Sequence, residues 1–316
     1  VNPPLGPDGP NKARFTAFPA GAIEGGKPPI GFSRGARSWS FPDQTVLIKS
    51  FGFQKKAGDP RSHQWIETRL LLKQQGEWVG YSYAWNSQQT DATLVAKAGA
   101  DRAFTIETPE GSPDRFDWHF PSRTECMVCH SRAANFVLGL SAAQLNRDHN
   151  YVDAESGKAK TDNQLRVLGH LGLIRLPKSK AKDGTFLASD FDRLADPYDR
   201  KQSLEDRVRS YLHSNCAQCH VESGGGNAQM LLSFNTALDK AKMIGEAPLH
   251  DRFGIKDAKL VAPGEPEKSI LLHRLNRRGR GQMPQLGTKI VDDRAVKLMT
   301  NWISALKSQP AKVEKP

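Results

Sequence analysis

The sequence predicts a multidomain protein: an N-terminal antiparallel β domain, either a sandwich or an open barrel, followed by two mainly α-helical domains. Short alternating apolar runs fill the first third of the chain, a C-x-x-C-H pattern occurs twice after them, and helical periodicity surrounds the second copy. Because 316 residues exceed one typical domain, several units are expected. Their expected boundaries are 1–35 for an irregular lead-in, 36–120 for the β-rich domain, 121–200 for the first motif domain and 201–316 for the second.

The β-rich domain is predicted from alternation. The lead-in is rich in glycine and proline and shows no sustained period, whereas short apolar runs begin at residue 38. The runs that predict strands are 45–51, 66–72, 78–85, 93–96 and 103–106. The Gln-Gln-Gly-Glu segment at 74–77 predicts a hairpin. Five of the six tryptophans lie in or beside these strands, which indicates an aromatic core, with a sugar-binding platform as the alternative.

Helical signals are weak around the first C-x-x-C-H segment. Pro121 argues against a long helix leading into Cys126, because proline removes a backbone donor and clashes with the preceding turn. Apolar residues at 138–145 and 165–174 predict two helical pieces. A polar loop at 153–162 is expected to separate them.

Helices around the second segment have clear start signals. Ser203 is followed by two acidic residues and starts a helix that runs into Cys216. Asp292 or Asp293 caps a final helix with an apolar stripe. A short capped helix is expected at 263–275 between them.

All four cysteines belong to the two C-x-x-C-H segments, residues 126–130 and 216–220. Two cysteines three positions apart on a helical turn project the same way, and a histidine follows directly. This pattern is the attachment signature of a c-type haem, with two thioether bonds and a proximal imidazole. We therefore expect two covalently attached haem c groups, held by Cys126, Cys129, Cys216 and Cys219, with His130 and His220 as iron ligands.

A zinc site, a thioredoxin-like site and two structural disulfides are the alternative interpretations of the cysteines. A zinc site usually has its two halves some 15 to 20 residues apart, whereas these pairs start 90 residues apart, at 126 and 216. A thioredoxin-like site needs a single C-x-x-C and no histidine after it. Two short disulfides would remove little chain entropy and leave both histidines unexplained.

Residues 203–306 resemble a class I cytochrome c domain in three respects: a helix enters the motif, a late methionine lies beside proline at 283–284, and a C-terminal helix has an aromatic face. The resemblance implies that Cys216 and Cys219 hold the haem, with His220 proximal and Met283 distal. Gln285 stands where many relatives have a second proline. The whole chain also resembles a group of bacterial dihaem proteins with a β-rich N-terminal domain.

The sequence predicts the distal ligand of the second haem more clearly than that of the first. Met283 follows His220 by 63 residues, long enough to cross the haem and return with a thioether. The alternatives are a core methionine, or Met230 and Met243 as rival ligands. Histidine with methionine raises the reduction potential and suits electron transfer.

For the first haem, His170 is the expected distal ligand, because it lies on an apolar segment between two glycines. A core histidine, His149 as the ligand, and a vacant distal position are the alternatives. A vacant position would let the iron bind peroxide or another small molecule.

Charge bears on partners and location. The formal net charge of +11 favours an acidic partner, here a periplasmic redox protein. No nucleic-acid-binding motif and no apolar stretch of membrane-spanning length occurs, so neither nucleic acid nor a membrane span is expected. Covalent haem attachment takes place outside the bacterial cytoplasm, which predicts a periplasmic or secreted protein although no signal peptide pattern opens the sequence.

An arginine cluster before Met283 has two interpretations: a solvated face, or a positive rim that steers an acidic partner or pairs with haem propionates. Its members are Arg274, Arg277, Arg278 and Arg280.

The sequence favours an electron-transfer protein over two other classes. One alternative is a dihaem peroxidase-type enzyme with an openable distal site. The other is a binding module whose β domain contacts a carbohydrate or an enzyme.

Overall fold

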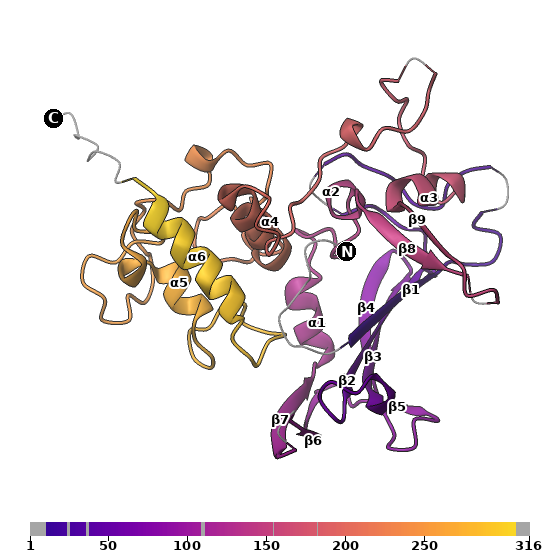
Figure 1. The fold of residues 1–316 in the computed structure, drawn as a ribbon, viewed down its shortest axis with the longest axis horizontal. Helices are drawn as coiled ribbons and strands as arrows, with labels where there is room; N and C mark the ends of the chain where they lie inside the picture. Colours follow the sequence, from indigo (N-terminus) through magenta and orange to yellow (C-terminus); the bar gives the residue numbers. More distant parts are fainter. Residues whose placement is uncertain are drawn as a thin grey trace. The chain divides into compact units, whose positions relative to one another are not determined.

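The computed structural model describes residues 11–23, 26–35, 38–108, 111–153, 155–181 and 183–307 (Figure 1). The chain divides into two compact units, an N-terminal unit, Asp8–Phe191, and a C-terminal unit that includes Asp192–Pro316. The predicted boundary at 200/201 lies close to this division. The predicted boundary at 120/121 does not separate units, because the sheet and the first motif belong to the same one. No helix in the described ranges is long and apolar enough to cross a bilayer.

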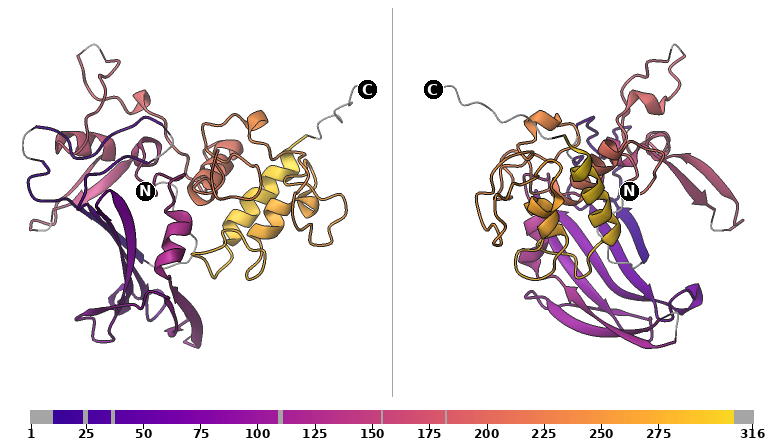
Figure 2. Two further views of the ribbon diagram at one scale, coloured as in Figure 1. Left: turned by 180° about the vertical axis from the view of Figure 1, so that it is seen from behind. Right: turned by 60° about the vertical axis from the view of Figure 1, so that its left-hand side comes forward.

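The N-terminal unit contains a five-stranded antiparallel sheet in the order β1-β2-β3-β4-β5 (Figures 1 and 2). Its strands are β1 Asn11–Ala17, β2 Val46–Gln54, β3 His63–Gln74, β4 Glu77–Trp85 and β5 Ala92–Leu94. Gln75 and Gly76 form the β3–β4 turn with φ of 53° and 80°, the left-handed conformation that such a hairpin requires. The predicted antiparallel sheet and its hairpin are confirmed.

Strand β1 corrects the prediction of an irregular lead-in. It pairs with β2 over its whole length, from Asn11 opposite Gly52 to Ala17 opposite Val46. Its sequence, NKARFTA, alternates polar residues with Ala13, Phe15 and Ala17, a short signal within a segment rich in glycine and proline. Pairing with β2 supplies the backbone hydrogen bonds that stabilise it as a strand.

A second, two-stranded sheet consists of β6 Ala100–Glu107 and β7 Pro113–Phe120. It packs against the main sheet through aromatic and aliphatic side chains. The buried members of this cluster are Ile66, Ala84, Val95 and Phe120, and Phe53, Phe104, Phe116 and Trp118 pack against them. A short 3-10 helix, η1 Pro60–Ser62, connects β2 to β3.

The segment after β7 shares a core with the main sheet. Its elements are α1 Arg123–Cys129, α2 Ala142–Leu145, β8 Asp148–Val152, β9 Ala159–Asn163, α3 Gln164–His170 and η2 Ala188–Asp190. Leu71 and Trp78 of the sheet belong to the same buried cluster as Val137, Leu145 and Leu165. This shared core explains why the β domain and the first motif form one unit. The two predicted helical pieces are confirmed as α2 and α3, whereas the predicted polar loop is the β8–β9 hairpin.

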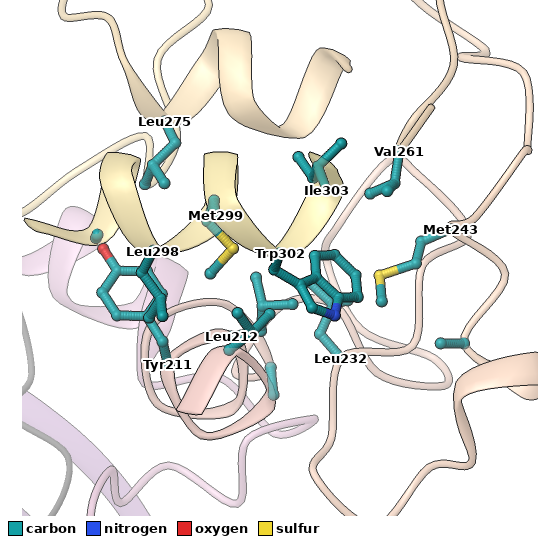
Figure 3. Close-up of a cluster of buried hydrophobic side chains, with 14 residues drawn as sticks. Tyr211, Leu212, Leu232, Met243, Val261, Leu275, Leu298, Met299, Trp302 and Ile303 are labelled. Atoms are coloured by element: carbon teal, nitrogen blue, oxygen red, sulfur yellow. The ribbon is translucent and has the colours of Figure 1, made fainter. Parts of the chain in front are cut away.

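The C-terminal unit contains α4 Leu204–Cys216, η3 Leu238–Lys240, η4 Pro266–Lys268, α5 Ile270–Leu275 and α6 Asp293–Ala305. Both predicted caps are confirmed: Ser203 accepts from the backbone N–H of Asp206 at 3.0 Å, and Asp292 from that of Ala295 at 3.1 Å. Helices α4 and α6 pack together: Met299 points toward Leu212, and the ring of Trp302 points toward Met243 and Leu232 (Figure 3). The apolar stripe of α6 is the core of this unit.

The prediction of two mainly α-helical domains was wrong. In residues 121–200, α1, α2 and α3 have only 7, 4 and 7 residues and accompany a hairpin. In the C-terminal unit, long irregular segments connect helices of 13, 6 and 13 residues. Backbone hydrogen bonds between loops satisfy these segments, for example from Leu231 to Ala241 at 2.9 Å and from Val261 to Met243 at 3.0 Å. Glycine and proline in these loops disfavour helix.

The tryptophans of the N-terminal unit belong to its packing. Trp39 and Trp78 are buried, and Trp65, Trp85 and Trp118 are half-buried. The indole N–H of Trp85 donates to the hydroxyl of Thr68 at 2.9 Å. This burial favours the core interpretation over a sugar-binding platform.

Candidate functional site

The first motif lies on a short, strongly capped helix. Ser122 accepts from the backbone N–H of Glu125 at 3.1 Å, and the Glu125 carboxylate accepts from the backbone N–H of Ser122 at 2.8 Å. This reciprocal capping box starts α1 directly after Pro121, so no long helix enters the motif, as predicted. Cys129 ends the helix, and the backbone N–H of His130 donates to the carbonyl of Cys126 at 3.0 Å. The two thiols and the imidazole therefore belong to one helical turn.

The imidazole of His130 is held in one tautomer. Its Nδ1 lies 2.6 Å from the carbonyl oxygen of Phe136. Because a carbonyl only accepts, Nδ1 carries the proton and Nε2 keeps its lone pair. Burial lowers the pKa of His130 to about 4, although the Phe136 carbonyl opposes this shift. At neutral pH the ring is a neutral donor ligand in a fixed orientation.

The turn that carries Phe136 is conformationally strained. Asn135 and Phe136 have φ of 53° and 61°, which a bulky residue rarely adopts. The side-chain amide of Asn135 donates to the carbonyl of Ser38 at 2.8 Å, which fixes the turn from another segment. The surrounding structure thus stabilises a conformation that places the carbonyl on His130.

Gly80 of strand β4 lies in close contact with Cys126. A Cβ at Gly80 would lie 2.7 Å from the Cβ and 2.8 Å from the Sγ of Cys126. Any side chain at this position would displace the cysteine. The close approach fixes Cys126 against the sheet.

The second motif follows a longer helix. Cys216 is the last residue of α4, and its carbonyl accepts from the backbone N–H of both Cys219, at 3.1 Å, and His220, at 2.9 Å. A Cβ at Gly226 would lie 2.6 Å from Nδ1 of His220, and one at Gly224 would lie 2.1 Å from the Cys219 carbonyl oxygen. The glycine-rich loop after the motif therefore lies directly on the cysteine and the imidazole.

His220 is buried with one nitrogen unsatisfied. It is 8 % exposed, and its Nδ1 makes no hydrogen bond of standard geometry within the described residues. Burial lowers the pKa of His220, and the backbone of Ala228 offsets part of that shift. A lowered pKa keeps the ring neutral at neutral pH, and a neutral imidazole has a lone pair that can bind a metal.

The surroundings of the thiols disfavour their ionised form. None of the four cysteines forms a disulfide. Burial raises the pKa of Cys216 to about 12, with Cys219 adding to the shift, and burial also raises the pKa of Cys126. Redox-active and zinc-binding cysteines need the thiolate, which a raised pKa disfavours. No group of three or more His, Cys, Asp or Glu side chains that could hold a metal ion occurs in the part of the chain described.

The three candidate methionine ligands, Met230, Met243 and Met283, lie in different environments. Met243 is buried in the apolar cluster of the C-terminal unit and Met230 packs against that cluster. Met283 is half-buried in a loop, where its backbone N–H donates to the carbonyl of Arg274 at 3.0 Å. The side chain of Arg274 also donates to the carbonyl of Gly281 at 3.0 Å. Met283 therefore lies on a braced loop outside the core.

The arginine cluster is neither a plain solvated face nor a free rim. The guanidinium groups of Arg274 and Arg277 each lie 4.7 Å from the centre of the Phe253 ring. Arg278 donates to the hydroxyl of Thr288 at 3.2 Å. These three arginines are half-buried, whereas Arg280 is exposed. Arg274 and Arg278 stabilise the loop that carries Met283, a role that composition alone did not indicate.

The distal candidates of the first motif both lie at the surface. His170 is exposed at the C-terminal end of α3, while Leu165 on the same helix is buried. His149 is exposed on β8, with its ring 4.8 Å from that of Tyr151. His170 is therefore no core histidine, and its assignment as a ligand stays a prediction.

The sequence did not single out a polar group beside the first motif. Glu67 is fully buried and forms a bidentate pair with Arg69, both contacts at 2.8 Å. It also accepts from the indole of Trp118 at 2.9 Å and from the hydroxyl of Ser82. The signal in the sequence was a pair of opposite charges within the predicted strand 66–72, and the strand register was needed to interpret it.

Comparisons of the chain with protein-family models, curated proteins and solved structures give no match. The family resemblance therefore depends on the two motifs and their surroundings.

Proposed function

We propose that the chain is a dihaem c-type cytochrome that transfers electrons between redox partners outside the cytoplasm. The residues that would hold the two haems are Cys126, Cys129 and His130 for the first, and Cys216, Cys219, His220 and Met283 for the second. The basic net charge of +11 favours a partner with an acidic surface.

The observation that carries the proposal is the state of the two imidazoles. His130 donates through Nδ1 to a backbone carbonyl, which leaves the Nε2 lone pair for a metal. His220 is buried with a lowered pKa, so it too is neutral at neutral pH. Each ring directly follows two thiols on one turn. This donor set matches covalent haem attachment better than zinc or thiol redox chemistry.

A bound haem supplies an iron that alternates between the ferric and ferrous states, one electron at a time. The residues of this chain would hold and tune it. The thiols would fix its position, the Phe136 carbonyl would orient the imidazole of His130, and the apolar cluster around the second motif would exclude water. The thioether of Met283 would raise the reduction potential and fill the distal position.

Haem counting tests the proposal. The full chain, produced with a haem-maturation system in a periplasm, should contain two haems by pyridine haemochrome assay and by intact mass. The paired variants Cys126→Ala/Cys129→Ala and Cys216→Ala/Cys219→Ala should each retain one. A colourless protein, or one that contains zinc instead, would contradict the proposal.

Ligation of the second haem is tested at Met283. Met283→Ala should remove the ferric absorption band of methionine-bound haem and lower the reduction potential of that haem. Met230→Ala is the matched control, because Met230 packs against the core and should leave the band intact. Loss of the band in the control instead would assign the ligand to Met230.

A dihaem peroxidase-type enzyme is the second candidate. The exposed positions of His170 and His149 favour it, because neither ring is packed where burial would hold it on an iron. In that case the first haem would be high-spin and would bind carbon monoxide or cyanide. Two low-spin haems that bind neither ligand would favour electron transfer alone.

A further inference from the structure

Three cations lie side by side on one face of the main sheet. The register pairs Arg14 of β1 with Lys49 of β2, and Lys49 with Arg69 of β3. Directly opposite residues in an antiparallel sheet lie on the same face, with Cβ atoms about 4.5–5.5 Å apart. We call Arg14, Lys49 and Arg69 the cation row.

Only one member of the cation row has a counter-charge. Arg69 forms the bidentate pair with Glu67, whose carboxylate is also occupied by Trp118 and Ser82. Within the described residues, the side chains of Arg14 and Lys49 have no hydrogen bond and no ion pair. The ammonium of Lys49 lies 4.8 Å from the centre of the Phe51 ring. The row is thus left with two unneutralised cations.

The row is electrostatically unfavourable without an anion. The pKa of Lys49 is lowered well below its ordinary value, first by burial and then by Arg14, Arg69 and Lys12, while Glu67 acts in the opposite direction. Like charges directly opposite each other destabilise a sheet. A bound carboxylate would remove this repulsion and supply acceptors for both side chains.

The cation row faces the first motif. Arg69 pairs with Ser82 of β4, and Gly80, two residues earlier on the same face, contacts Cys126. The cation row therefore lies on the face of the sheet that carries Cys126, with Arg69 one strand, Lys49 two strands and Arg14 three strands from β4. A haem attached at Cys126 would carry two carboxylates of its own over this face.

We propose that Arg14, Lys49 and Arg69 form a carboxylate-binding site that holds the propionates of a haem attached at Cys126 and Cys129. This inference rests on the proposed function. Arg69 is pre-positioned by Glu67, and Lys49 and Arg14 supply the free donors.

The test uses the full chain with its haems attached and compares Lys49→Gln with Lys49→Arg. Lys49→Gln should shift the propionate bending band of the first haem in resonance Raman spectra. It should also change that haem's reduction equilibrium at least tenfold toward the oxidised form, about 59 mV for one electron. Lys49→Arg should stay within about twofold of wild type. The exposed Lys158→Gln, in the β8–β9 turn, is the matched charge control and should change neither.

Arg14→Gln provides a second variant that is safe for folding, because Arg14 is exposed on an edge strand. It should shift the same band by a smaller amount. An unchanged band and equilibrium in both variants would overturn the assignment to propionates.

Free carboxylates are tested separately with succinate, at constant ionic strength, by thermal unfolding. If haem counting finds no first haem, the proposed function fails, but the cation row still stands as a carboxylate site if succinate stabilises wild type and not Lys49→Gln. The same succinate result in a chain that has its haem, with an unchanged Raman band, assigns the row to a free carboxylate and overturns the propionate assignment. No effect of succinate together with an unchanged band overturns the site altogether.

Discussion

The two C-x-x-C-H segments share their chemistry but not their support. The first lies on α1, a capped helix of 7 residues between a hairpin and a turn with left-handed φ, and Gly80 of the sheet contacts its first cysteine. The second ends α4, a helix of 13 residues that packs on α6 within an apolar cluster. Charged groups adjoin the first, whereas aliphatic and aromatic side chains surround the second.

The C-x-x-C-H pattern therefore predicts which side chains would hold a haem, but it does not predict the environment around them. Both histidines are neutral at neutral pH, but only His130 is oriented by a hydrogen bond of standard geometry to a backbone carbonyl. The surroundings, however, set the local dielectric and the nearby charge, which are the main protein controls on a haem's potential. Two haems held by the same motif are therefore expected to differ in reduction potential, and each support can be weakened separately.

The largest loss of stability is expected from substitution of Glu67. Glu67→Ala should lower the free energy of unfolding of the N-terminal unit by about 3–5 kcal/mol, because Arg69 would keep a partly buried charge without its partner. Glu107→Ala, whose pair with Lys56 is exposed, is the control and should cost less than about 1 kcal/mol. Segment-resolved hydrogen exchange in urea separates the two units. Equal losses in both variants would show that the buried pair is not what supports the first motif.

Acid should weaken the C-terminal unit through His213. Burial lowers its pKa to about 4, below the ordinary value of 6.5, so the unfolded chain binds a proton at higher pH than the folded one. Stability is therefore retained above pH 6.5 and lost as pH falls toward 4. The loss is on the order of 3 kcal/mol at about 1.4 kcal/mol per pKa unit.

Removing the ring should remove that part of the acid sensitivity. His213→Gln should flatten the dependence of unfolding free energy on pH between 6.5 and 4, whereas the exposed His250→Gln should not. An unchanged slope in His213→Gln would assign the acid sensitivity to other groups.

Substitution of Gly80 or Gly226 should destabilise one motif and not the other, with an intermediate loss of unfolding free energy. Gly80→Ala places a Cβ 2.7 Å from that of Cys126, and Gly226→Ala places one 2.6 Å from Nδ1 of His220. Overpacking of this kind costs about 1–3 kcal/mol. Each variant should lower thermal stability and the haem yield of its own motif only, as read by haemochrome assay. Gly225→Ala, where an added Cβ meets nothing within 4 Å, is the matched control.

The smallest effect is expected at the helix caps. Ser122→Ala and Ser203→Ala should each cost about 1 kcal/mol, because each removes the acceptor of one backbone N–H at a helix start. Hydrogen exchange should increase at the start of α1 in the first variant and of α4 in the second. Exchange that spreads to the other helix would contradict independent supports.

Local signals in the sequence predicted much of this fold. Alternation identified β2, β3 and β4, a glycine identified their hairpin, and Ser203 and Asp292 identified helix starts, because each depends on residues only a few positions apart. The spacing of the cysteines and histidines likewise defined both candidate sites. Strand β1 and the β8–β9 hairpin were not predicted. Strand β1 pairs with a strand far along the chain, and the residues of the β8–β9 hairpin are mostly polar, without apolar alternation.

By itself, then, the sequence predicted which side chains could hold the haems: four thiols for covalent attachment, and the imidazoles of His130, His220 and His170 with the thioether of Met283 as iron ligands. The tertiary structure decided what surrounds them. Only the register of β1, β2 and β3 aligns Arg14, Lys49 and Arg69, and only the packing of α1 on β4 brings them to the first motif. Charges separated by tens of residues interact according to their distance in space, and distance in space is set by packing rather than by spacing along the chain.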